Sequence, residues 1–175
     1  SSHRNRGRGA CAISHAISGV AQEGIFTLLE FPPDTSGCEE NKECLTLVFG
    51  DLDKFKSVND TYGHQAGDMV LRSAAQLLQL KLRGTDSVGR YGGEEFVLIL
   101  PKAPQQAAEM VCERILKAFR DTTHEISSGH SITVTISLGI ATHTTEQPYS
   151  NISELLRDAD QAVYYSKAHG RNRVT

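Results

Sequence analysis

The apolar residues of this chain follow two spacings, one typical of helices and one typical of strands. In four segments they recur three or four positions apart, which predicts helices that each bury one apolar face. These segments lie at about 12–21, 70–78, 107–119 and 152–163. The second is expected to end near Gly84. Asn151, with Glu154 three positions later, resembles a capping arrangement for the last helix, and Gly170 suits its C-terminal end.

Short β-rich runs between these segments predict strands. Leu45 to Phe49 is too short for a helix and is bounded by Gly50, so it indicates a buried strand. Phe96 to Leu100 is a second buried run, and Pro101 ends it. The glycine pair at 92–93 favours a tight hairpin, with one strand before the pair and this run after it, since such turns need positive φ and glycine supplies it.

Two further strands complete the predicted fold. Residues 131–142 alternate β-branched positions, and residues 172–175 form a final edge strand. The resulting order α-β-α-β-β-α-β-α-β has no internal repeat or linker, which predicts one domain over residues 1–175. Residues 1–9 are basic and glycine-rich and are expected to form a frayed tail. The fold class is therefore predicted as α+β, with a central, mainly antiparallel sheet flanked by helices.

Composition narrows the function classes. The formal net charge of −3 argues against bulk electrostatic binding to nucleic acid or to an acidic membrane. No apolar run approaches the roughly 20 residues that span a bilayer, and no signal peptide opens the chain. The cysteines lack zinc-site spacing, which favours reduced thiols. We expect a cytoplasmic domain that contacts neither nucleic acid nor membrane.

The order of residues in "RYGGEEF" raises a chemical question, because two adjacent acids follow the glycine pair. A hairpin turn explains the glycines but leaves Glu94 and Glu95 unexplained. Asp51 lies where the strand that begins at Leu45 ends. If the two strands are neighbours, Asp51 and Glu94 come together and form the kind of oxygen site that Mg²⁺ prefers. The alternative is that each acid is a solvated loop residue.

The polar segment after Asp51 offers further candidates. Backbone amides of a turn there would cradle phosphate, with Lys56 as a nearby charge. Asn59 and Asp68 are residue types that can read the edge of guanine. The structural alternatives are that Asp68 caps the following helix and that Asn59 belongs to a turn.

Two basic positions close the list of candidates. Lys167 and Arg171 are four positions apart, which would place them on one helical face as a triphosphate clamp. Cations at a helix C-terminus also complement the helix dipole, so this structural reading stays open. Arg83 and Asp86, in "RGTD", resemble an ordinary exposed helix end.

Four motifs resemble the GGDEF family of diguanylate cyclases in order and spacing. They are "FGDLDKFKSVNDTYGHQAGD", "RYGGEEF", "TISLGIAT" and "ADQAVYYSKAHGRNRV". The resemblance covers nearly the whole chain from about Leu45 to Val174. It implies a fold like the nucleotidyl cyclase and polymerase palm, with a ferredoxin-like core. It also implies a reaction in which two GTP molecules give cyclic di-GMP and two pyrophosphates.

The resemblance assigns roles to individual residues. Asp51, Glu94 and Glu95 would form the catalytic set, with Glu95 as general base for the ribose 3′-hydroxyl. Asp51, Glu94 and the Leu52 carbonyl would hold Mg²⁺, with Mn²⁺ as the alternative metal. The guanine would be bound by Asn59 and Asp68, and the phosphates by Phe55, Lys56, Lys167 and Arg171.

The resemblance also implies partners and regulation. Each subunit would hold one GTP, so a homodimer, at least transient, is needed for turnover. The family's inhibitory product site is an RxxD sequence ahead of the signature, which here is formed by Arg83 and Asp86, with Arg114 as a secondary contact.

One departure from the family pattern lies at the N-terminus. Only Asn5-Arg6 matches the motif that usually opens the domain, so we expect that an N-terminal sensor or regulatory part is missing from this chain. Through that part the full-length protein would be able to reach a membrane. The alternative function is a catalytically silent module that binds GTP or cyclic di-GMP.

Overall fold

The computed structural model describes residues 44–84, 86–127, 129–144, 146–150 and 152–175. The expected tail at 1–9, the helix expected near 12–21, and the expected capping residue Asn151 lie outside the described residues.

The centre of the fold is a four-stranded sheet in the order β2-β3-β1-β6, in which all neighbouring strands are antiparallel. Its strands are β1 (Leu45–Leu52), β2 (Ser87–Arg90), β3 (Glu95–Pro101) and β6 (Ile136–His143). Val174 adds a short parallel bridge to Leu138, so the expected C-terminal edge strand is confirmed as a single bridge. Consecutive strands β2 and β3 form the predicted hairpin.

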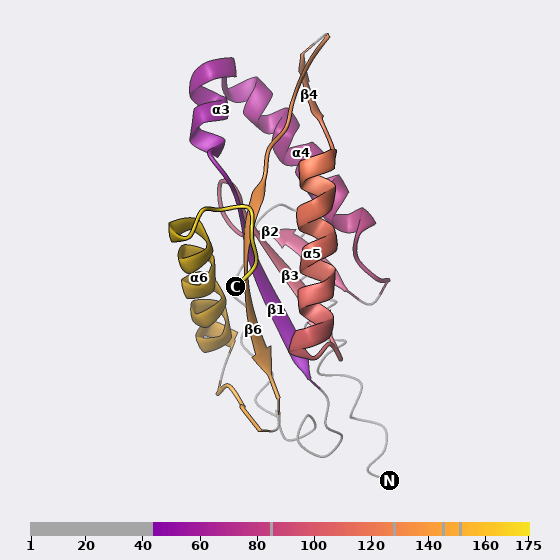
Figure 1. The fold of residues 1–175 in the computed structure, drawn as a ribbon, viewed down its shortest axis with the longest axis vertical. Helices are drawn as coiled ribbons and strands as arrows, with labels where there is room; N and C mark the ends of the chain where they lie inside the picture. The colour runs from indigo at the N-terminus through magenta and orange to yellow at the C-terminus, as the bar shows by residue number, and fades with distance from the viewer. Residues whose placement is uncertain (1–43, 85, 128, 145, 151) are drawn as a thin grey trace.

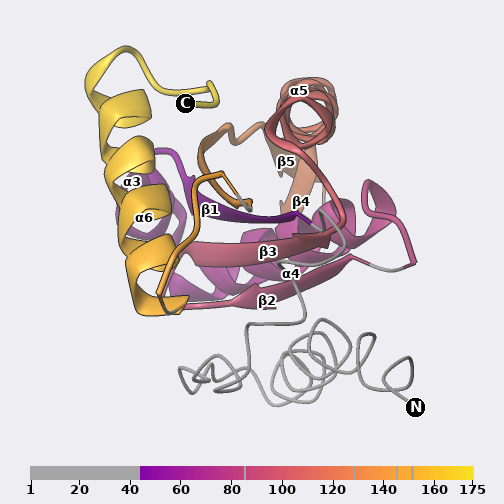
Figure 2. The ribbon, with the colours of Figure 1, turned by 90° about the horizontal axis from the view of Figure 1, so that it is seen from below.

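Helices cover both faces of this sheet. They are α3 (Phe55–Tyr62), α4 (His64–Leu80), α5 (Gln105–Asp121) and α6 (Ile152–Ala168). The larger apolar cluster joins α4 and α5 to one face of the sheet, and a smaller cluster joins α6 to the other. In both views of the ribbon β1 therefore lies between α5 and α6 (Figures 1 and 2). The predicted α+β class is confirmed.

Strand alternation decides which side chains face α6. Leu47 and Phe49 belong to the α6 cluster, whereas Val48 belongs to the α4–α5 cluster. Because successive side chains of a strand point to opposite faces, Asp51 continues the row of Leu47 and Phe49 toward α6. Its cross-strand partner Glu95 lies on the same face. Two acids of the predicted site thus share the surface that α6 covers.

α6 approaches the sheet closely at Gly139 of β6. A Cβ atom on Gly139 would collide with the Ala159 carbonyl oxygen and with the Val163 backbone nitrogen. Only glycine therefore permits the observed contact between helix and strand. This close approach sets the distance between α6 and the sheet.

Two expectations for the region after β1 were wrong. Gly50 does not end the strand, which runs on to Leu52 because its backbone pairs with β3 and β6 on both sides. The polar segment that follows is helical, with α3 and α4 separated only at Gly63, where φ is +91°. Phe55 and Val58 bury the inner face of α3. Since α4 begins at His64, Asp68 is inside a helix and does not cap it.

The predicted strand over 131–142 is interrupted. β5 (His130–Ile132) pairs with β4 (His124–Ser127) in a separate hairpin, and β6 begins only at Ile136. This hairpin projects beyond the sheet at the end of the molecule where α3 lies (Figure 1). Its strands were missed or merged because each is very short, and because β4 is half exposed and β5 has no buried residue.

The helix ends were predicted with mixed success. α4 ends at Leu80, ahead of the expected Gly84. Gly170, by contrast, has φ +114° and is followed by a hydrogen bond from the Arg171 amide to the Ser166 carbonyl oxygen at 2.9 Å. This six-to-one bond is the signature of a glycine-terminated helix, so the C-terminal end predicted for α6 is confirmed.

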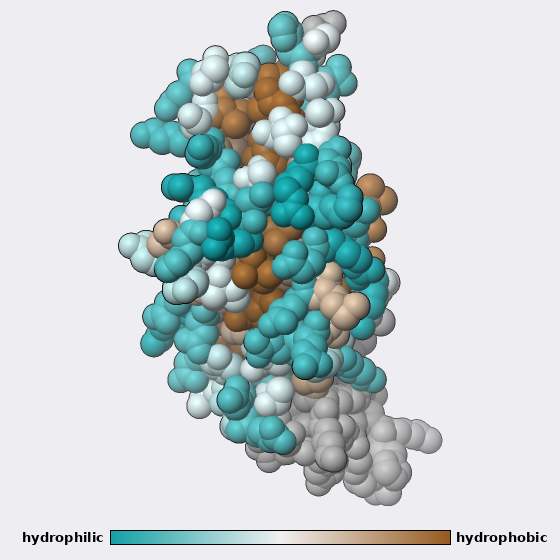
Figure 3. All heavy atoms as spheres, viewed as in Figure 1, coloured by the Kyte–Doolittle hydropathy of each residue, from teal (hydrophilic) through white to brown (hydrophobic). Residues whose placement is uncertain are grey.

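The surface of the described part is mainly hydrophilic on the face shown in Figure 3. Apolar residues are visible there mostly in strips, between α3 and the β4–β5 hairpin and between α6 and α5. None of the helices in the described residues is long and apolar enough to cross a membrane.

Candidate active site

The ends of β1 and of the β2–β3 hairpin meet at one edge of the sheet. Asp51 is the cross-strand partner of Glu95, and the Leu52 amide donates a hydrogen bond to the Glu94 carbonyl oxygen at 3.2 Å. The expected proximity of the two acidic segments is therefore a property of the backbone pairing. It brings Asp51, Leu52 and Glu94 together, which are the residues expected to hold a metal.

Asp51 is an unusual carboxylate because it is buried but only half satisfied. Its residue is 8% exposed, and its Oδ2 lies 2.7 Å from the Nζ of Lys167. Its Oδ1 is buried and has no hydrogen-bond partner among the described residues. Burial raises the pKa of Asp51, the charge of Lys167 opposes this rise, and the charges of Glu94 and Asp53 add to it.

These features fit a divalent cation. The unpartnered oxygen of Asp51 and the nearby carboxylate of Glu94 are hard oxygen donors of the kind that Mg²⁺ and Mn²⁺ accept, and the expected third ligand, the Leu52 carbonyl, is of the same kind. Over the residues that the structure describes, three or more His, Cys, Asp or Glu side chains nowhere form a metal-binding group. Two carboxylates agree with the ligation usual for Mg²⁺, which uses one or two carboxylates and takes its other oxygens from water and substrate phosphates.

The geometry of the Gly-Gly turn differs from the prediction. Neither Gly92 nor Gly93 has positive φ, so the expectation of left-handed turn geometry was wrong. A Cβ atom on Gly92 would instead lie 2.6 Å from Oε2 of Glu95, whose carboxylate occupies that space. Arg90 closes the turn from outside, because its Nε donates to the carbonyl oxygens of Gly92 and Gly93 at 2.9 and 3.0 Å.

Glu95 combines partial burial with a crowd of negative charge. Burial raises its pKa, and the charges of Asp51, Asp160 and Glu94 raise it further, while Lys167 acts in the opposite direction. A raised pKa brings a carboxylate closer to the range where it accepts a proton effectively near neutral pH. Asp160 lies on α6 and was not identified from the sequence.

The two residues expected to bind guanine lie on α3 and α4. Asn59 packs against Gly67, because a Cβ atom at Gly67 would collide with the Asn59 side-chain oxygen. Asp68 is exposed on α4 and lines a cavity of 430 Å³ together with Arg90 and Phe96 of the hairpin. The expected alternatives, a turn at Asn59 and a cap at Asp68, are both wrong, since both residues are helical.

The four residues expected to bind phosphate are divided. Phe55 is buried at the start of α3, and Lys56 beside it is exposed. Lys167 is paired with Asp51. Arg171 does not share a helical face with Lys167, because α6 ends at Ala168 and Arg171 adopts φ +61° beyond it. The prediction that Lys167 and Arg171 share one helical face was therefore wrong.

Arg83 and Asp86 form a closed turn with each other. The Arg83 Nε and Nη2 donate to the Asp86 carboxylate at 2.7 to 3.2 Å, and the Arg83 amide donates to it at 2.9 Å. Nη2 also donates to the Pro101 carbonyl oxygen at 3.1 Å. Arg83 and Arg114 line one cavity of 1020 Å³ beside α5. The structure thus brings together the residues expected at the product site.

Asp53 was missed by sequence reasoning. It is 6% exposed, and its carboxylate accepts hydrogen bonds from the hydroxyls of Thr135 and Ser137 and from the Asn172 amide. Its partners lie in segments far away in the sequence. The only sequence feature that could have drawn attention to Asp53 is its position two residues after Asp51. Arg90 was also missed, although it is the first residue of the RYGGEEF motif.

Comparison with known proteins gives a consistent picture. The family model "Diguanylate cyclase, GGDEF domain" matches residues 29–173. Diguanylate cyclase A of Treponema denticola is 37% identical over 163 residues, which is 93% of this chain and 41% of that protein. Diguanylate cyclase DosC of Escherichia coli K12 is 36% identical over 130 residues, which is 74% of this chain and 28% of that protein. The chain thus spans less than half of these relatives.

Solved structures agree with this. The GGDEF domain of DgcB from Caulobacter crescentus, in complex with c-di-GMP, has a TM-score of 0.70 and 27% identity, covering 97% of this chain and 88% of that one. The active GGEEF domain of a diguanylate cyclase from Vibrio cholerae has a TM-score of 0.70 and 25% identity, covering 97% of this chain and 94% of that one. With its paired strand ends and its GGEEF turn, the chain belongs to the GGDEF family of diguanylate cyclase domains.

Proposed function

We propose that this chain is a catalytic diguanylate cyclase domain that condenses two GTP molecules into cyclic di-GMP and two pyrophosphates. The observation that carries the proposal is the state of Asp51. Its Oδ1 is buried without a partner, next to Glu94, at the joined ends of β1 and the hairpin. A carboxylate that only fills a structural role would have both oxygens satisfied. The intact GGEEF sequence and the relatives named diguanylate cyclase support the same reaction.

The metal is proposed to be Mg²⁺, with Mn²⁺ as the alternative, held by Asp51, Glu94 and the Leu52 carbonyl. When bound, it supplies positive charge to the triphosphate and to the oxygens that react at the α-phosphorus. The Leu52 amide is already bonded to the Glu94 carbonyl oxygen, which orders the segment that carries these ligands.

The remaining side chains position the substrate. Asn59 and Asp68 are proposed to bind guanine, and the cavity beside Asp68 supports this by offering space between α4 and the hairpin. The start of α3 at Phe55 and Lys56, together with Lys167 and Arg171, is proposed to bind the phosphates. This arrangement orients the α-phosphorus for in-line attack, which is the main contribution a protein makes to phosphoryl transfer.

Glu95 is proposed to accept the proton of the attacking 3′-hydroxyl. Its raised pKa supports this role, since the carboxylate then holds a proton more readily than an exposed glutamate does. Each domain has one such site, so the 3′-hydroxyl of the GTP in one site must attack the α-phosphorus of the GTP in another. A homodimer, at least transient, follows from this stoichiometry.

The direct test is to incubate the chain with GTP and Mg²⁺ and to separate the products by chromatography. Cyclic di-GMP in the wild type and its loss in Asp51→Asn are expected. ATP offered beside GTP tests whether the base is selected as proposed. If no cyclic di-GMP forms even when the domain is forced to dimerise, the catalytic proposal is wrong for this chain.

A second candidate is a module that binds cyclic di-GMP without turnover. The cavity that Arg83 and Arg114 line supports a product site, because two guanidinium groups beside one cavity suit a phosphate-rich ligand. Calorimetry with cyclic di-GMP separates the candidates when it is combined with the product assay. Binding without synthesis favours the module, and binding with synthesis indicates product inhibition.

A further inference from the structure

We infer that Asp53 is a positioning residue that holds Arg171 in place for the triphosphate. This inference rests on the proposed function and adds a residue to it. The carboxylate of Asp53 joins the end of β1 to the segment after α6, which is 119 positions away in the chain. It thereby connects the metal end of the site to its phosphate end.

The carboxylate uses both oxygens. Oδ1 accepts from the Ser137 hydroxyl at 2.6 Å, and Oδ2 accepts from the Thr135 hydroxyl at 2.7 Å and from the Asn172 amide at 3.1 Å. The Asp53 amide also donates to the Thr135 carbonyl oxygen at 2.9 Å. Within the described residues all partners of its carboxylate are neutral donors, so no opposite charge there accounts for a buried acid at this position.

The segment held by Asp53 has an unfavourable backbone. Arg171 and Asn172 adopt φ +61° and +47°, and Lys54 next to Asp53 adopts φ +56°. Left-handed geometry is costly for residues with a Cβ atom and persists only where the surroundings enforce it. These three residues line one cavity of 590 Å³ together with Asp53. Strain is therefore concentrated around the carboxylate that ties the segments together.

The backbone around Arg171 is held by hydrogen bonds on both sides of the residue. Its amide donates to the Ser166 carbonyl oxygen at 2.9 Å, and its own carbonyl oxygen accepts from the Arg173 Nε at 3.2 Å. The next amide, that of Asn172, is the one that Asp53 binds. The exposed guanidinium of Arg171, by contrast, makes no ion pair or hydrogen bond with another residue in the described part of the chain. A rigid backbone that presents a free cation suits the binding of an anion.

The test is a double-mutant cycle on ligand binding. Affinity is measured for a GTP analogue with a methylene group in place of the α,β-bridging oxygen, in the presence of Mg²⁺, so turnover does not contribute. Asp53→Ala is expected to weaken binding roughly tenfold, a size usual for residues that orient a ligand-binding group. In an Arg171→Ala background the same change is expected to cost less than about twofold, because the two residues act as one unit.

Two further variants keep the test decisive. Asp53→Asn preserves volume and one carbonyl acceptor, and is expected to give an intermediate loss; it replaces Asp53→Ala in the cycle if the alanine variant does not fold. Ser137→Ala removes one donor without touching the Asn172 link, and is expected to leave affinity within about twofold of wild type. Thermal unfolding is recorded for every variant.

The outcomes separate this inference from the proposed activity. Equal losses of affinity with and without Arg171 overturn the positioning role, even if the wild type makes cyclic di-GMP. So does unchanged affinity in Asp53→Ala. A loss that disappears without Arg171 supports the role, and it does so even in a protein that makes no product, in which case only the proposed activity fails.

Discussion

Lys167 Nζ lies 2.7 Å from Oδ2 of Asp51, so the last helix places a cation against the carboxylate at the end of the first described strand. The side chains are 31% and 11% exposed, respectively, so the pair is shielded from water on the Asp51 side. The contact depends on the close packing of α6 on Gly139. Lys167 therefore compensates the charge of Asp51, and it is also one of the residues proposed above to bind phosphate.

Replacing Lys167 by methionine is expected to destabilise the fold, because Asp51 then keeps its burial and loses its counter-charge. The expected loss is about 1–2 kcal/mol in the free energy of unfolding, less than for a fully buried pair. Added Mg²⁺ is expected to recover part of it, since a cation at Asp51 restores the balance. Chemical denaturation with and without Mg²⁺ measures both effects.

The matched control is Lys117→Met on α5. Lys117 pairs with Asp121 at the protein surface, so its loss is expected to change the free energy of unfolding by less than about 0.5 kcal/mol, with no response to Mg²⁺. Equal behaviour of the two variants would contradict the special position of Lys167.

Glu94→Gln is expected to abolish turnover while preserving the fold. Glu94 lies in the hairpin turn and is only half-buried, and its backbone carbonyl, which the variant keeps, forms the bond to Leu52. Loss of one metal ligand is expected to lower the rate of cyclic di-GMP synthesis by roughly a hundredfold or more. Chromatography gives the rate, and thermal unfolding gives the stability. A cooperative loss of stability would instead assign Glu94 a structural role.

Much of the fold was predictable because long helices and buried strands leave a regular pattern of apolar residues in the sequence. α5 and α6 and strands β1 and β3 follow from runs that must face a core on one or both sides. α3 was not predictable in the same way, since only Phe55 and Val58 are buried in it and its stability comes from packing on α4. The β4–β5 hairpin was missed for a similar reason, because its few residues form no sustained pattern.

The site residues at the ends of neighbouring strands could be predicted from the sequence. The contacts between segments far apart in the sequence could not. Asp51 and Glu94 could be brought together from the strands that precede and follow them. No local pattern links Asp51 to Lys167, or Asp53 to Asn172, because these contacts depend on the seating of α6 and its C-terminal segment. Gly92 shows the same limit: the carboxylate of Glu95 lies against it, a contact that turn rules do not contain.

Arg83→Ala is expected to weaken cyclic di-GMP binding by roughly tenfold or more, because a guanidinium that can pair with phosphate in two places is lost. The Asp86 side chain is fully buried in its pair with Arg83, so the variant is also expected to lose stability. Calorimetry well below the unfolding midpoint isolates the binding effect. Lys81→Ala removes an equal charge from a nearby exposed position and is expected to bind product normally. Unchanged affinity in Arg83→Ala would remove the RxxD interpretation.

The rate of cyclic di-GMP synthesis is expected to fall as the pH decreases. This fall, the acid limb of the pH–rate profile, is expected to follow the protonation of Glu95. The pKa of Glu95 is raised by burial first and then by the charges of Asp51, Asp160 and Glu94, so the carboxylate becomes protonated at a higher pH than an exposed glutamate. Asp160→Asn removes one of these charges without changing volume. It is expected to lower the pKa of Glu95 and to move the acid limb toward lower pH.

The control for this shift is Asp121→Asn, which removes an equal charge from the exposed end of α5. Its acid limb is expected to coincide with that of the wild type. If Asp160→Asn also leaves the limb in place, the limb belongs to a group other than Glu95. Rates measured across pH at saturating GTP decide the matter.

His124 is expected to make the fold sensitive to acid. It is fully buried, its Nδ1 forms a 2.6 Å hydrogen bond with the Ser73 hydroxyl, and its Nε2 is buried without a partner in the described residues. Burial lowers its pKa below the ordinary value of 6.5, so the folded state holds the neutral ring. As pH falls below 6.5 the unfolded chain takes up a proton that the folded protein resists, and stability is lost until the pH passes the lowered pKa.

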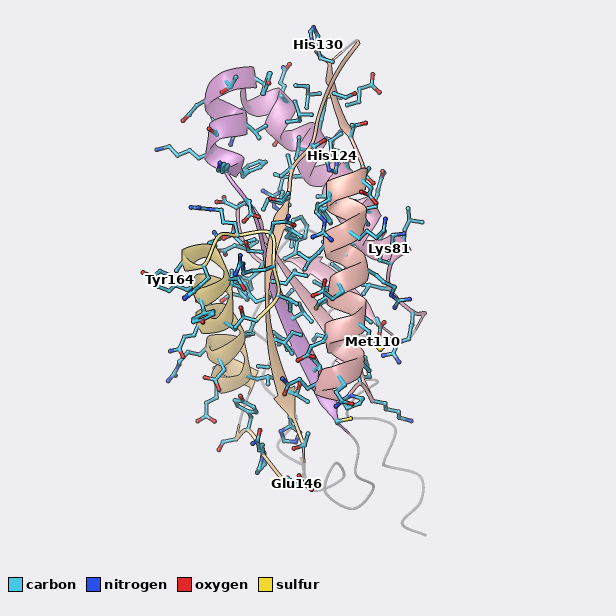
Figure 4. All side chains as sticks on the ribbon, viewed as in Figure 1. Lys81, Met110, His124, His130, Glu146 and Tyr164 are labelled. Atoms are coloured by element: carbon cyan, nitrogen blue, oxygen red, sulfur yellow. The ribbon has the colours of Figure 1, made fainter. Side chains whose placement is uncertain are left out.

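His130 offers the matched control, because it lies at the exposed tip of the same hairpin, whereas His124 lies nearer the body of the protein (Figure 4). His124→Gln keeps a polar side chain of similar size and is expected to flatten the fall of the unfolding midpoint between pH 7 and the acid range, at some cost in stability near neutrality. His130→Gln is expected to preserve the full slope. Thermal unfolding followed over this pH range compares the three proteins. An unchanged slope in His124→Gln would show that the acid sensitivity arises elsewhere in the protein.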